Sequence, residues 1–469
     1  MSERNLTLLT DLYELTMMQG YFHAKDANET VIFDAFYRTN PDGNGFAIAA
    51  GLEQVVEYIE NLHFDKEDID YLRTTGLFGE DFLEYLADFK FTGDIYAIPE
   101  GTVVFPREPL VKVIAPIMQA QLVETAILNI INHQSLIATK TSRIVHAACG
   151  DGVMEFGLRR AQGPDAGIYG ARAAMIAGCI GTSNVLCGQM FDVPVKGTHA
   201  HSWIMSFPDE LTAFRTYARL YPTACILLVD TYDTLNSGIP HAIQVFKEMR
   251  AEGIPLTFYG IRMDSGDLAY LSKEAKKMLD AEGFTDAVIS ASNDLDETLI
   301  TSLKNQGATI NSWGVGTNLI TSKDNPAFGG VYKLAAIRTA DGSFQPKIKL
   351  SENVEKVTNP GNKTFYRVYD KKTGKIKADL ICLYDETFDE SEDLKLFDPN
   401  APWKKTRLPG GSYTLREMLI PVIKAGKTIY TSPGVMEIRE ICNHEKDTIW
   451  DETKRFVNPQ EIYVDLSQK

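Results

Sequence analysis

One stretch of the sequence, residues 224–318, constrains the fold most, because short apolar runs alternate there with amphipathic segments. The runs have their centres near Leu227, Phe258, Ile289 and Trp313, about 25 to 32 residues apart, the length of a strand followed by a helix. Helical spacing of apolar residues marks the segments between them. The alternation therefore predicts consecutive β/α units with a parallel sheet, as in an α/β barrel. "GVMEFGLRR" (152–160) and "VPVKGTHAHSW" (193–203) fit as earlier members of the series.

The flanking regions differ in character and predict a chain of three parts. Residues 1–130 mix strand-like and helical runs, which indicates an N-terminal α/β domain. Residues 131–335 contain the (β/α) barrel. Residues 336–469 are richer in Lys, Pro, Gly and short strands, and we expect a smaller C-terminal α+β region that packs back on the N-terminal domain. Residues 115–149 have the spacing of one long helix or two abutting helices.

Composition limits the partners that such a chain can have. The formal charge of −16 excludes a general nucleic-acid binder, because backbone phosphates require a basic surface. No apolar run approaches the ~20 residues of a membrane span, and the N-terminus lacks a secretory signal, so we expect a cytoplasmic protein without membrane contact. The six cysteines are scattered without a C-x-x-C pair. This spacing predicts reduced, mostly buried thiols rather than a structural zinc site or disulfides.

Polar residues follow the apolar runs, at positions where a buried parallel strand would not need them. The carboxyl ends of barrel strands meet on one face, and barrel proteins have their active sites there. Six polar strand ends in one chain therefore predict a functional site on this face. The residues are Glu155 and Arg159, His199 and His201, Asp230 and Asp233, Arg262, Asp264 and Asp267, Ser292 and Asn293, and Gly314, Gly316 and Thr317.

Two of these strand ends indicate particular ligands. In "GVGT" (314–317), small residues let backbone N–H groups approach an anion and Thr317 adds a hydroxyl donor, although a tight turn would also need glycine. In "RMDSGD" (262–267), Arg262 can bind a planar carboxylate, while Asp264 and Asp267 can orient ribose hydroxyls or hold Mg2+. The alternatives are an internal ion pair and, for Asp267, the N-cap of the next helix.

Two further pairs keep more than one interpretation. Arg159 and Arg160 come at a predicted strand end, where alternation would let only one of them reach the site. His199 and His201 in "GTHAHSW" (197–203) would face the same way in a strand. They could be metal ligands, a catalytic base, a nucleophile or packing residues, and their spacing does not decide among these.

Several motifs in a fixed order resemble those of the nicotinate phosphoribosyltransferase family. The likeness spans nearly the whole sequence, and linked motifs in matching order are far more specific than any one of them. The motifs are "TDLYELTM" (10–17), "FGLRRAQGPDAG" (156–167), "GTHAHSW", "IRMDSGDL" (261–268), "SASNDLDE" (290–297), "GVGTN" (314–318), "GGVYKLAA" (329–336) and "KIKLSENVEKVTNPG" (347–361). The resemblance implies a type II phosphoribosyltransferase, with an irregular α/β barrel beside an α/β domain, and a homodimer with active sites at the subunit boundary.

The resemblance also implies an activity. The ring nitrogen of nicotinate would displace pyrophosphate from 5-phosphoribosyl 1-pyrophosphate, giving nicotinate mononucleotide for NAD salvage. ATP hydrolysis, with Mg2+, would drive the step through a transient phosphohistidine. Chemically, such a transfer needs mainly positioning and electrostatic stabilisation of the departing pyrophosphate, and no protein nucleophile on the sugar.

Residue roles follow from matching motif positions. His201 matches the phosphorylated histidine, and Tyr13 matches a tyrosine that stacks on the pyridine ring from the partner subunit. The resemblance further implies that Thr198 would lie beside nicotinate, Arg262 near its carboxylate and Thr317 at the ribose phosphate. His199 receives no role, and no resident metal ligand is assigned. The expected substrate-binding set is Tyr13, Arg159, Thr198, Arg262, Asp264, Asp267, Ser292, Asn293, Gly314, Gly316 and Thr317.

The same residues also allow other partners for His201 and other functions for the chain. A neutral imidazole that accepts a phosphoryl group needs a partner on its other nitrogen, and either Asp230 or Glu155 could supply it. The chain could instead use nicotinamide or quinolinate, or it could be a non-catalytic phosphosugar-binding protein on the same scaffold. A metal hydrolase that uses His199 and His201 is the weakest alternative, because further ligands are not evident.

Overall fold

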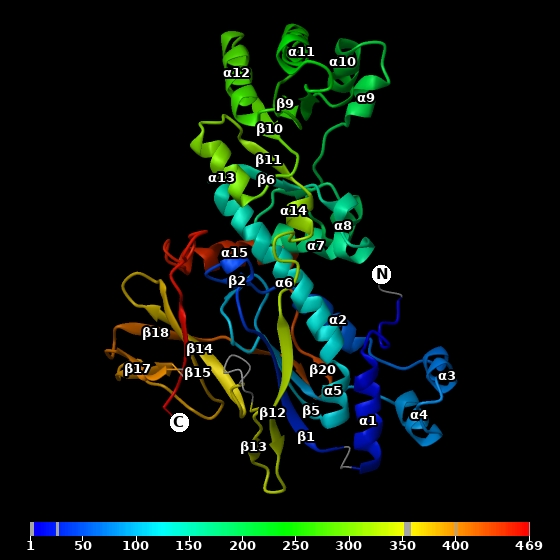
Figure 1. Cartoon of the computed structure of the whole chain (residues 1–469), viewed down its shortest axis with the longest axis vertical. Coiled ribbons are helices and arrows are strands. Elements are labelled where there is room, and N and C mark those ends of the chain that lie inside the picture. Colours follow the sequence, from blue (N-terminus) through cyan, green and yellow to red (C-terminus); the bar gives the residue numbers. More distant parts are fainter. Residues whose placement is uncertain (1–3, 25–27, 351–357, 399–400, 469) are drawn as a thin grey trace. The chain divides into compact units, whose positions relative to one another are not determined.

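The computed structural model describes residues 4–24, 28–350, 358–398 and 401–468, and its contacts form two compact units (Figure 1). The mixed-sheet unit contains residues 1–136, 327–433 and 440–469, and the parallel-sheet unit contains residues 137–326 and 434–439. The three-part division with boundaries at 130 and 335 stays a prediction. Of the motif at 347–361, residues 351–357 lie outside the described residues.

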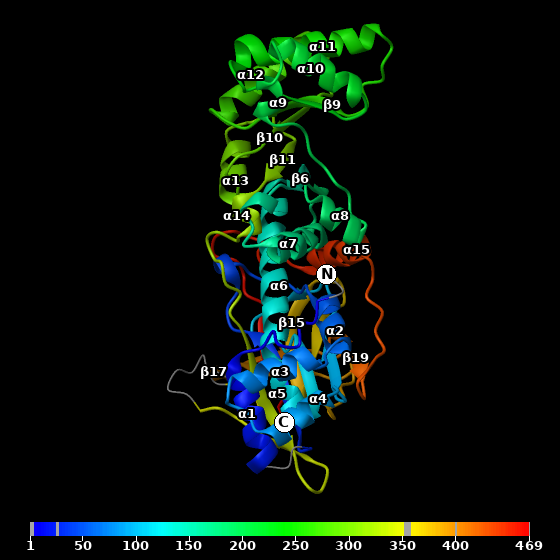
Figure 2. The ribbon, with the colours of Figure 1, turned by 90° about the vertical axis from the view of Figure 1, so that its right-hand side faces the viewer.

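Six parallel strands form the sheet of the parallel-sheet unit, in the order β7-β6-β11-β10-β9-β8. They are β6 (Gly152–Glu155), β7 (Gly181–Thr182), β8 (Cys225–Leu228), β9 (Tyr259–Met263), β10 (Val288–Ala291) and β11 (Ser312–Val315). The predicted β/α series is confirmed, because α11 (Ile239–Ala251), α12 (Leu268–Ala281) and α13 (Glu297–Asn305) connect β8 to β11 in turn. Figure 2 shows α10 (Glu210–Leu220), α11 and α12 gathered on one side of β9.

Close pairing of β9 with β10 brings two of the predicted site segments together. Gly260 lies opposite Val288, and a Cβ atom at position 260 would come within 2.0 Å of the carbonyl oxygen of Val288. A side chain at Gly260 would therefore push the strands apart. Because Gly260 permits the contact, Arg262 pairs with Ser290 and the residues after the two strands become neighbours.

One predicted member of the β/α series is wrong. Residues 193–203 do not form a strand: only Val195 makes a single bridge, to Thr182, and the short helix α9 (His201–Met205) begins at the second histidine. Residues 197–200 have no regular structure. The alternation rule for strands therefore does not apply to His199 and His201, and their side chains enter different surroundings.

The mixed-sheet unit contains two larger sheets that combine both ends of the chain. The seven-stranded sheet has the order β13-β12-β1-β5-β3-β19-β20 and the six-stranded sheet the order β17-β16-β21-β15-β14-β18. Their strands are β1 (Thr30–Tyr37), β3 (Asp94–Ala97), β5 (Val111–Pro116), β12 (Gly330–Arg338), β13 (Phe344–Pro346), β14 (Lys363–Asp370), β15 (Ile376–Leu383), β16 (Leu394–Asp398), β17 (Ala401–Leu408), β18 (Tyr413–Glu417), β19 (Ile420–Lys424), β20 (Lys427–Thr428) and β21 (Tyr463–Leu466). A two-stranded sheet pairs β2 (Ala47–Ile48) with β4 (Val103–Val104).

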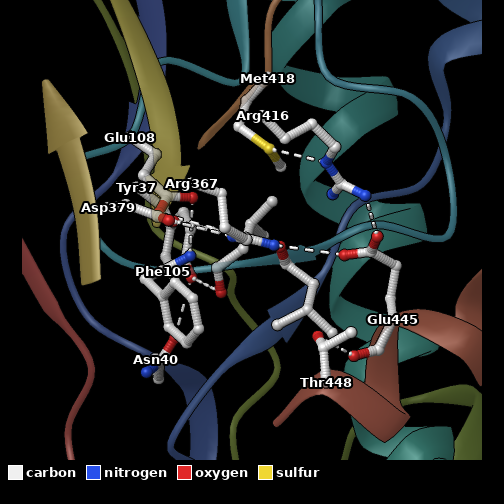
Figure 3. Close-up of polar contacts among 12 residues, drawn as sticks. Tyr37, Asn40, Phe105, Glu108, Arg367, Asp379, Arg416, Met418, Glu445 and Thr448 are labelled. Carbon is white, nitrogen blue, oxygen red and sulfur yellow. Dashed lines mark hydrogen bonds and ion pairs between the residues drawn. The ribbon is translucent and has the colours of Figure 1, made fainter. Parts of the chain in front are cut away.

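A buried arginine ties the C-terminal region to the N-terminal one, and the sequence predicts that these two regions pack together. The guanidinium of Arg367 in β14 is fully buried, and its Nη1 donates to the carbonyl oxygen of Val103 at 2.7 Å. Arg367 also pairs with Asp379 at 2.7 Å and with Glu445 at 3.2 Å (Figure 3). Because a buried charge is costly without partners, each of these contacts is needed to keep Arg367 inside the unit.

The remaining helices complete the two units. The segment at 115–149 forms two abutting helices, α5 (Ile117–Leu122) and α6 (Glu124–Ala147), which confirms the second of the two predicted possibilities. The others are α1 (Leu12–Ala24), α2 (Leu52–Glu60), α3 (Lys66–Thr74), α4 (Glu80–Ala87), α7 (Pro164–Ala177), α8 (Val185–Phe191), α14 (Thr317–Ile320) and α15 (Val435–Thr448). All six cysteines are free, and five of them are buried, as predicted. Within the described ranges, no helix is long and apolar enough to span a membrane.

Candidate functional site

Arg262 lies at the centre of the polar residues on the carboxyl edge of the parallel sheet. Its Nε donates to Ser292 Oγ at 3.0 Å, and its Nη1 donates to Thr198 Oγ1 at 2.5 Å and to the carbonyl oxygen of His199 at 3.3 Å. Asp264 is 3.9 Å from its Nη2. Burial lowers the pKa of Arg262, although a guanidinium stays charged at neutral pH. The strand end therefore holds a cation that hydrogen bonds keep in one orientation.

Two carboxylates lie beside this cation. Asp230, which follows β8, is buried, and its Oδ2 accepts from the backbone N–H of Asp264 and from the hydroxyl of Ser265, both at 2.7 Å. Its Oδ1 is buried without a hydrogen-bond partner in the described part of the chain. Asp264 is partly exposed and accepts from Ser292 Oγ at 2.5 Å. One carboxylate is thus held rigidly and the other faces outward.

His201 contacts both carboxylates and one hydroxyl. Its Nε2 lies 4.0 Å from Asp230 Oδ1 and 3.9 Å from Asp264 Oδ2, and its Nδ1 is 3.1 Å from Thr231 Oγ1. The side chain is 38% exposed. Of the two carboxylates considered as its partner, Asp230 is the one near the ring. Glu155 instead accepts from the hydroxyl of Thr182 at 2.6 Å and from the backbone N–H of Gly157.

His199 has a structural environment that differs from that of His201. Its Nε2 accepts the backbone N–H of Leu228 at 3.3 Å, and its ring packs edge-on against Tyr217 at 4.6 Å between centroids. Burial lowers the pKa of His199 to about 4, so the imidazole is neutral. Since Nε2 is engaged by the backbone, the two histidines do not form a matched pair of metal ligands. Among the described residues, no cluster of three or more His, Cys, Asp or Glu could hold a metal ion.

Arg159 lies in a 3-10 turn, Leu158–Arg160, that follows β6. Strand alternation therefore does not separate Arg159 from Arg160, and both side chains are exposed. Burial lowers the pKa of Arg262, the charges of Asp264 and Asp230 raise it, and the like charge of Arg159 lowers it further. The predicted contact of Arg159 with the substrates stays a prediction.

The glycines at the end of β11, Gly314 within the strand and Gly316 directly after it, come close to the segment after β6. A Cβ atom at Gly314 would lie 2.6 Å from the ring of Phe156, and one at Gly316 would lie 3.3 Å from its carbonyl oxygen. Both glycines therefore allow tight packing, and Thr317 begins α14 directly after them. After β10, Asn293 adopts a left-handed backbone with φ of 86°, which is uncommon outside glycine and indicates a constrained turn.

Two predicted aspartates act as helix caps. Asp267 accepts from the backbone N–H of Tyr270 at 3.0 Å and caps α12. Asp233 accepts from the backbone N–H of Asn236 at 2.9 Å and is exposed. Asp267 is therefore the N-cap of α12, as the sequence analysis considered. Its contacts with a ligand stay a prediction.

Tyr13 belongs to the mixed-sheet unit and not to the unit that carries the strand ends. It lies in the first turn of α1, and its side chain is 47% exposed. Tyr13 is therefore not a core residue of the chain, and its role toward the pyridine ring stays a prediction. Burial of the hydroxyl and its neighbours Glu14 and Glu124 raise the pKa of Tyr13, so the phenol is neutral.

Family models match three consecutive parts of the chain. They describe the nicotinate phosphoribosyltransferase N-terminal domain at residues 8–132, the nicotinate phosphoribosyltransferase family at 152–375 and the nicotinate phosphoribosyltransferase C-terminal domain at 362–469. A nicotinate phosphoribosyltransferase of Bacillus subtilis is 46% identical over 464 residues, covering 99% of this chain and 93% of that protein. The chain belongs to the nicotinate phosphoribosyltransferase family.

Solved structures agree with this family and its fold. The crystal structure of the human nicotinic acid phosphoribosyltransferase is 28% identical and superposes with a TM-score of 0.83, covering 98% of each chain. The nicotinate-nucleotide pyrophosphorylase of Pyrococcus furiosus, 22% identical, has a TM-score of 0.72 over 95% of this chain and 97% of that one, and shares the fold. The predicted irregular α/β barrel with an α/β domain and a C-terminal appendage is therefore confirmed.

Sequence reasoning missed two polar residues of this phosphoribosyltransferase family member. Thr231 contacts His201, and Ser265 holds Asp230. Both directly follow residues that the sequence analysis selected, Asp230 and Asp264. The sequence analysis treated these positions as parts of strands, in which neighbouring side chains point to opposite faces. Thr231 and Ser265 instead lie after their strands, where this rule does not apply.

Proposed function

We propose that the chain transfers a phosphoribosyl group from 5-phosphoribosyl 1-pyrophosphate to nicotinate in NAD salvage, and that ATP hydrolysis drives the transfer through phosphorylation of His201. Membership of the family supports the transfer itself. The observation that carries the ATP-dependent part is the position of His201, whose side chain is 38% exposed and whose Nε2 lies 4.0 Å from Asp230 and 3.9 Å from Asp264.

The transfer step needs binding groups rather than a nucleophile. Arg262 is a cation that hydrogen bonds hold in place, and it suits the carboxylate of nicotinate. Thr198, whose hydroxyl contacts Arg262, would lie beside that ligand. The residues at the carboxyl ends of the neighbouring strands would surround the ribose and phosphate groups of the second substrate: Ser292, Asn293, Gly314, Gly316 and Thr317.

The ATP-dependent step would take place at His201. A ring nitrogen would attack the terminal phosphorus of ATP, and the bond to the bridging oxygen would break as ADP leaves. Water later hydrolyses the phosphohistidine and releases phosphate. The ring must be neutral to act as the nucleophile, and the carboxylate of Asp230 near one ring nitrogen would stabilise the cationic form that develops.

Asp230 and Asp264 fit a magnesium ion that arrives with phosphate groups. Asp230 Oδ1 is buried without a hydrogen-bond partner among the described residues, and Asp264 Oδ2 faces the same histidine. Mg2+ is commonly held by one or two carboxylates, with substrate phosphates and water completing its shell. Bound there, the ion would neutralise phosphate charge next to the two carboxylates.

The proposal includes a homodimer in which Tyr13 stacks on the pyridine ring bound by the partner subunit. Tyr13 is exposed on α1 beside other exposed apolar side chains, Leu9, Leu12 and Met17. An exposed apolar helix face of this kind suits a subunit boundary, and an aromatic ring on that face suits stacking.

Labelling with ATP that carries a radioactive γ-phosphate tests the role of His201. We expect an acid-labile phosphate on a peptide containing His201, and a loss on the order of a hundredfold or more in both label and nicotinate-stimulated ATP hydrolysis in His201→Gln. His241→Gln is the matched control, because His241 lies in the same unit and contacts Glu210 at 2.9 Å. Full labelling of His201→Gln would refute the phosphohistidine.

A further inference from the structure

Thr231 is the first residue after Asp230, and among the described residues it alone forms a hydrogen bond to the ring of His201, between its Oγ1 and Nδ1 at 3.1 Å. We propose that Thr231 is a positioning residue that holds the imidazole of His201 in the orientation needed for phosphoryl transfer. This inference deepens the proposed function and rests on it, because it assigns to the reaction a residue outside the predicted site.

His201 needs such a contact because its backbone does not fix the ring. The residue starts a helix of only five residues, after a segment at 197–200 without regular structure, and the side chain is 38% exposed. A half-exposed imidazole on a helix end can rotate about two side-chain bonds. The nearby protein chain must therefore supply the directional contact that selects one rotamer.

The two carboxylates do not supply that direction. Asp230 and Asp264 lie 4.0 and 3.9 Å from Nε2, which is beyond the distance of a hydrogen bond. At this range they attract a positive ring by charge, and charge attraction depends weakly on angle. The hydroxyl of Thr231, on the opposite nitrogen, is within hydrogen-bond distance and therefore sets the plane of the ring.

Thr231 is well placed for this purpose because its surroundings are rigid. The chain before it leaves a buried strand, and the backbone N–H of Val229 donates to the carbonyl oxygen of Arg262 at 3.1 Å. The side chain of Asp230 is held from the other side by the N–H of Asp264 and by Ser265. The position of Thr231 is thus tied to β8 and β9.

The hydroxyl of Thr231 suits the imidazole of His201, because the protonation of that ring would change during the reaction. A threonine hydroxyl can donate to a bare ring nitrogen or accept from a protonated one. The contact to His201 can therefore persist in either neutral tautomer and in the cationic ring. Valine has the shape of threonine without this oxygen, and serine keeps the oxygen without the methyl group, so the two substitutions separate the hydrogen bond from packing.

The test compares Thr231→Val and Thr231→Ser in the full chain, by the rate of phosphate transfer from γ-labelled ATP to His201. We expect Thr231→Val to be labelled about tenfold more slowly, as for loss of one hydrogen bond, with KM for ATP changed less than about twofold. Thr231→Ser should keep a rate within about threefold of the unchanged protein. Thr216→Val is the control, because that hydroxyl donates within α10, to the carbonyl oxygen of Thr212 at 2.8 Å.

A second measurement follows the contact itself without ATP. In protein with nitrogen-15 histidine at constant pH, the ring signal of His201, assigned with His201→Gln, should shift in Thr231→Val and return toward its original position in Thr231→Ser. An unchanged ring signal, or unchanged labelling in Thr231→Val at the same thermal stability, would overturn the inference. Absence of label on unchanged His201, with the ring signal still shifted in Thr231→Val, would instead refute the proposed phosphohistidine.

Discussion

Arg262 shows how a single side chain defines the ligand that a site prefers. Three hydrogen bonds reach from it to Ser292, Thr198 and the carbonyl of His199, and all three acceptors are neutral. Of the two carboxylates near Arg262, Asp230 and Asp264, Asp264 is 3.9 Å from the guanidinium and also accepts from Ser292. Because none of the three hydrogen bonds goes to a carboxylate, a planar anion such as a pyridine carboxylate would give Arg262 a charged hydrogen-bond partner.

Replacing the guanidinium of Arg262 with a side chain that has fewer hydrogen-bond donors should weaken the binding of nicotinate. In Arg262→Lys we expect KM for nicotinate to rise about tenfold, because an ammonium group cannot keep the fork-shaped contacts of a guanidinium. The response to nicotinamide, which has no charge, should change less. Steady-state kinetics with both pyridines measure this. Arg160→Lys is the control, and an equal effect of both substitutions on nicotinate would contradict the role of Arg262.

At the residue scale, the sequence predicted those site residues that lie at the carboxyl end of a strand or directly after it. Arg262, Asp264 and Ser292 lie together as expected, because parallel strands place their carboxyl ends on one edge. His199 and His201 could not be separated from sequence, since their difference arises from an irregular segment and not from a strand. Thr231 was missed for the same reason: its orientation depends on a turn.

Asp267, at the start of helix α12, caps the helix and is also proposed to bind a substrate. Asp267 caps this helix through the backbone N–H of Tyr270. We expect Asp267→Ala to lower the free energy of unfolding by about 1 kcal/mol, as for other lost N-caps, whereas Asp267→Asn, which keeps an acceptor oxygen, should be close to neutral. Thermal unfolding of the two variants measures this difference.

The same pair of variants tests the ligand role. Because Asp267→Asn retains the cap and removes only the charge, we expect its KM for 5-phosphoribosyl 1-pyrophosphate to rise while its stability is unchanged. Unchanged kinetics in Asp267→Asn would show that Asp267 serves the helix alone.

At the element scale, the sequence pattern predicted secondary structure only where strands and helices alternate regularly. The strands β8 to β11 and their helices were predicted because each unit repeats after about 25 to 32 residues. The strand β7 has two residues, too few for any pattern, and the pairing of β19 with β3 joins residues more than 300 positions apart. Pairings of this kind depend on the folded chain as a whole and leave no local signal.

At the scale of the whole molecule, ionic contacts between distant segments hold the mixed-sheet unit together. Lys363 pairs with Asp34 at 2.6 Å, and both are buried. Arg367 is surrounded by Asp379, Glu445 and Glu108, and burial together with the charge of Asp379 raises the pKa of Glu108 well above its ordinary value. The sequence predicted that the C-terminal region packs on the N-terminal domain, but not which charges would meet.

Buried carboxyl groups in this unit should make its stability depend on pH. Burial raises the pKa of Glu14 to about 7 and that of Asp465 to about 6. Between the ordinary pKa of a carboxyl group and these values, the folded chain binds more protons than the unfolded chain. The free energy of unfolding therefore decreases as pH rises through this range.

Glu14 allows this dependence to be assigned to one group. Its side chain is fully buried on α1 and accepts from Gln121, and Glu14→Gln places a neutral group of the same shape there. We expect the unchanged protein to lose on the order of 2 kcal/mol of stability between about pH 5 and pH 8 through Glu14, and Glu14→Gln to lose correspondingly less. Thermal unfolding across that range measures both, with Glu60→Gln, an exposed glutamate of α2, as the control. Parallel pH profiles for the unchanged protein and Glu14→Gln would mean that Glu14 is ionised in the folded chain at pH 5, in which case the pH dependence must arise from other groups such as Asp465.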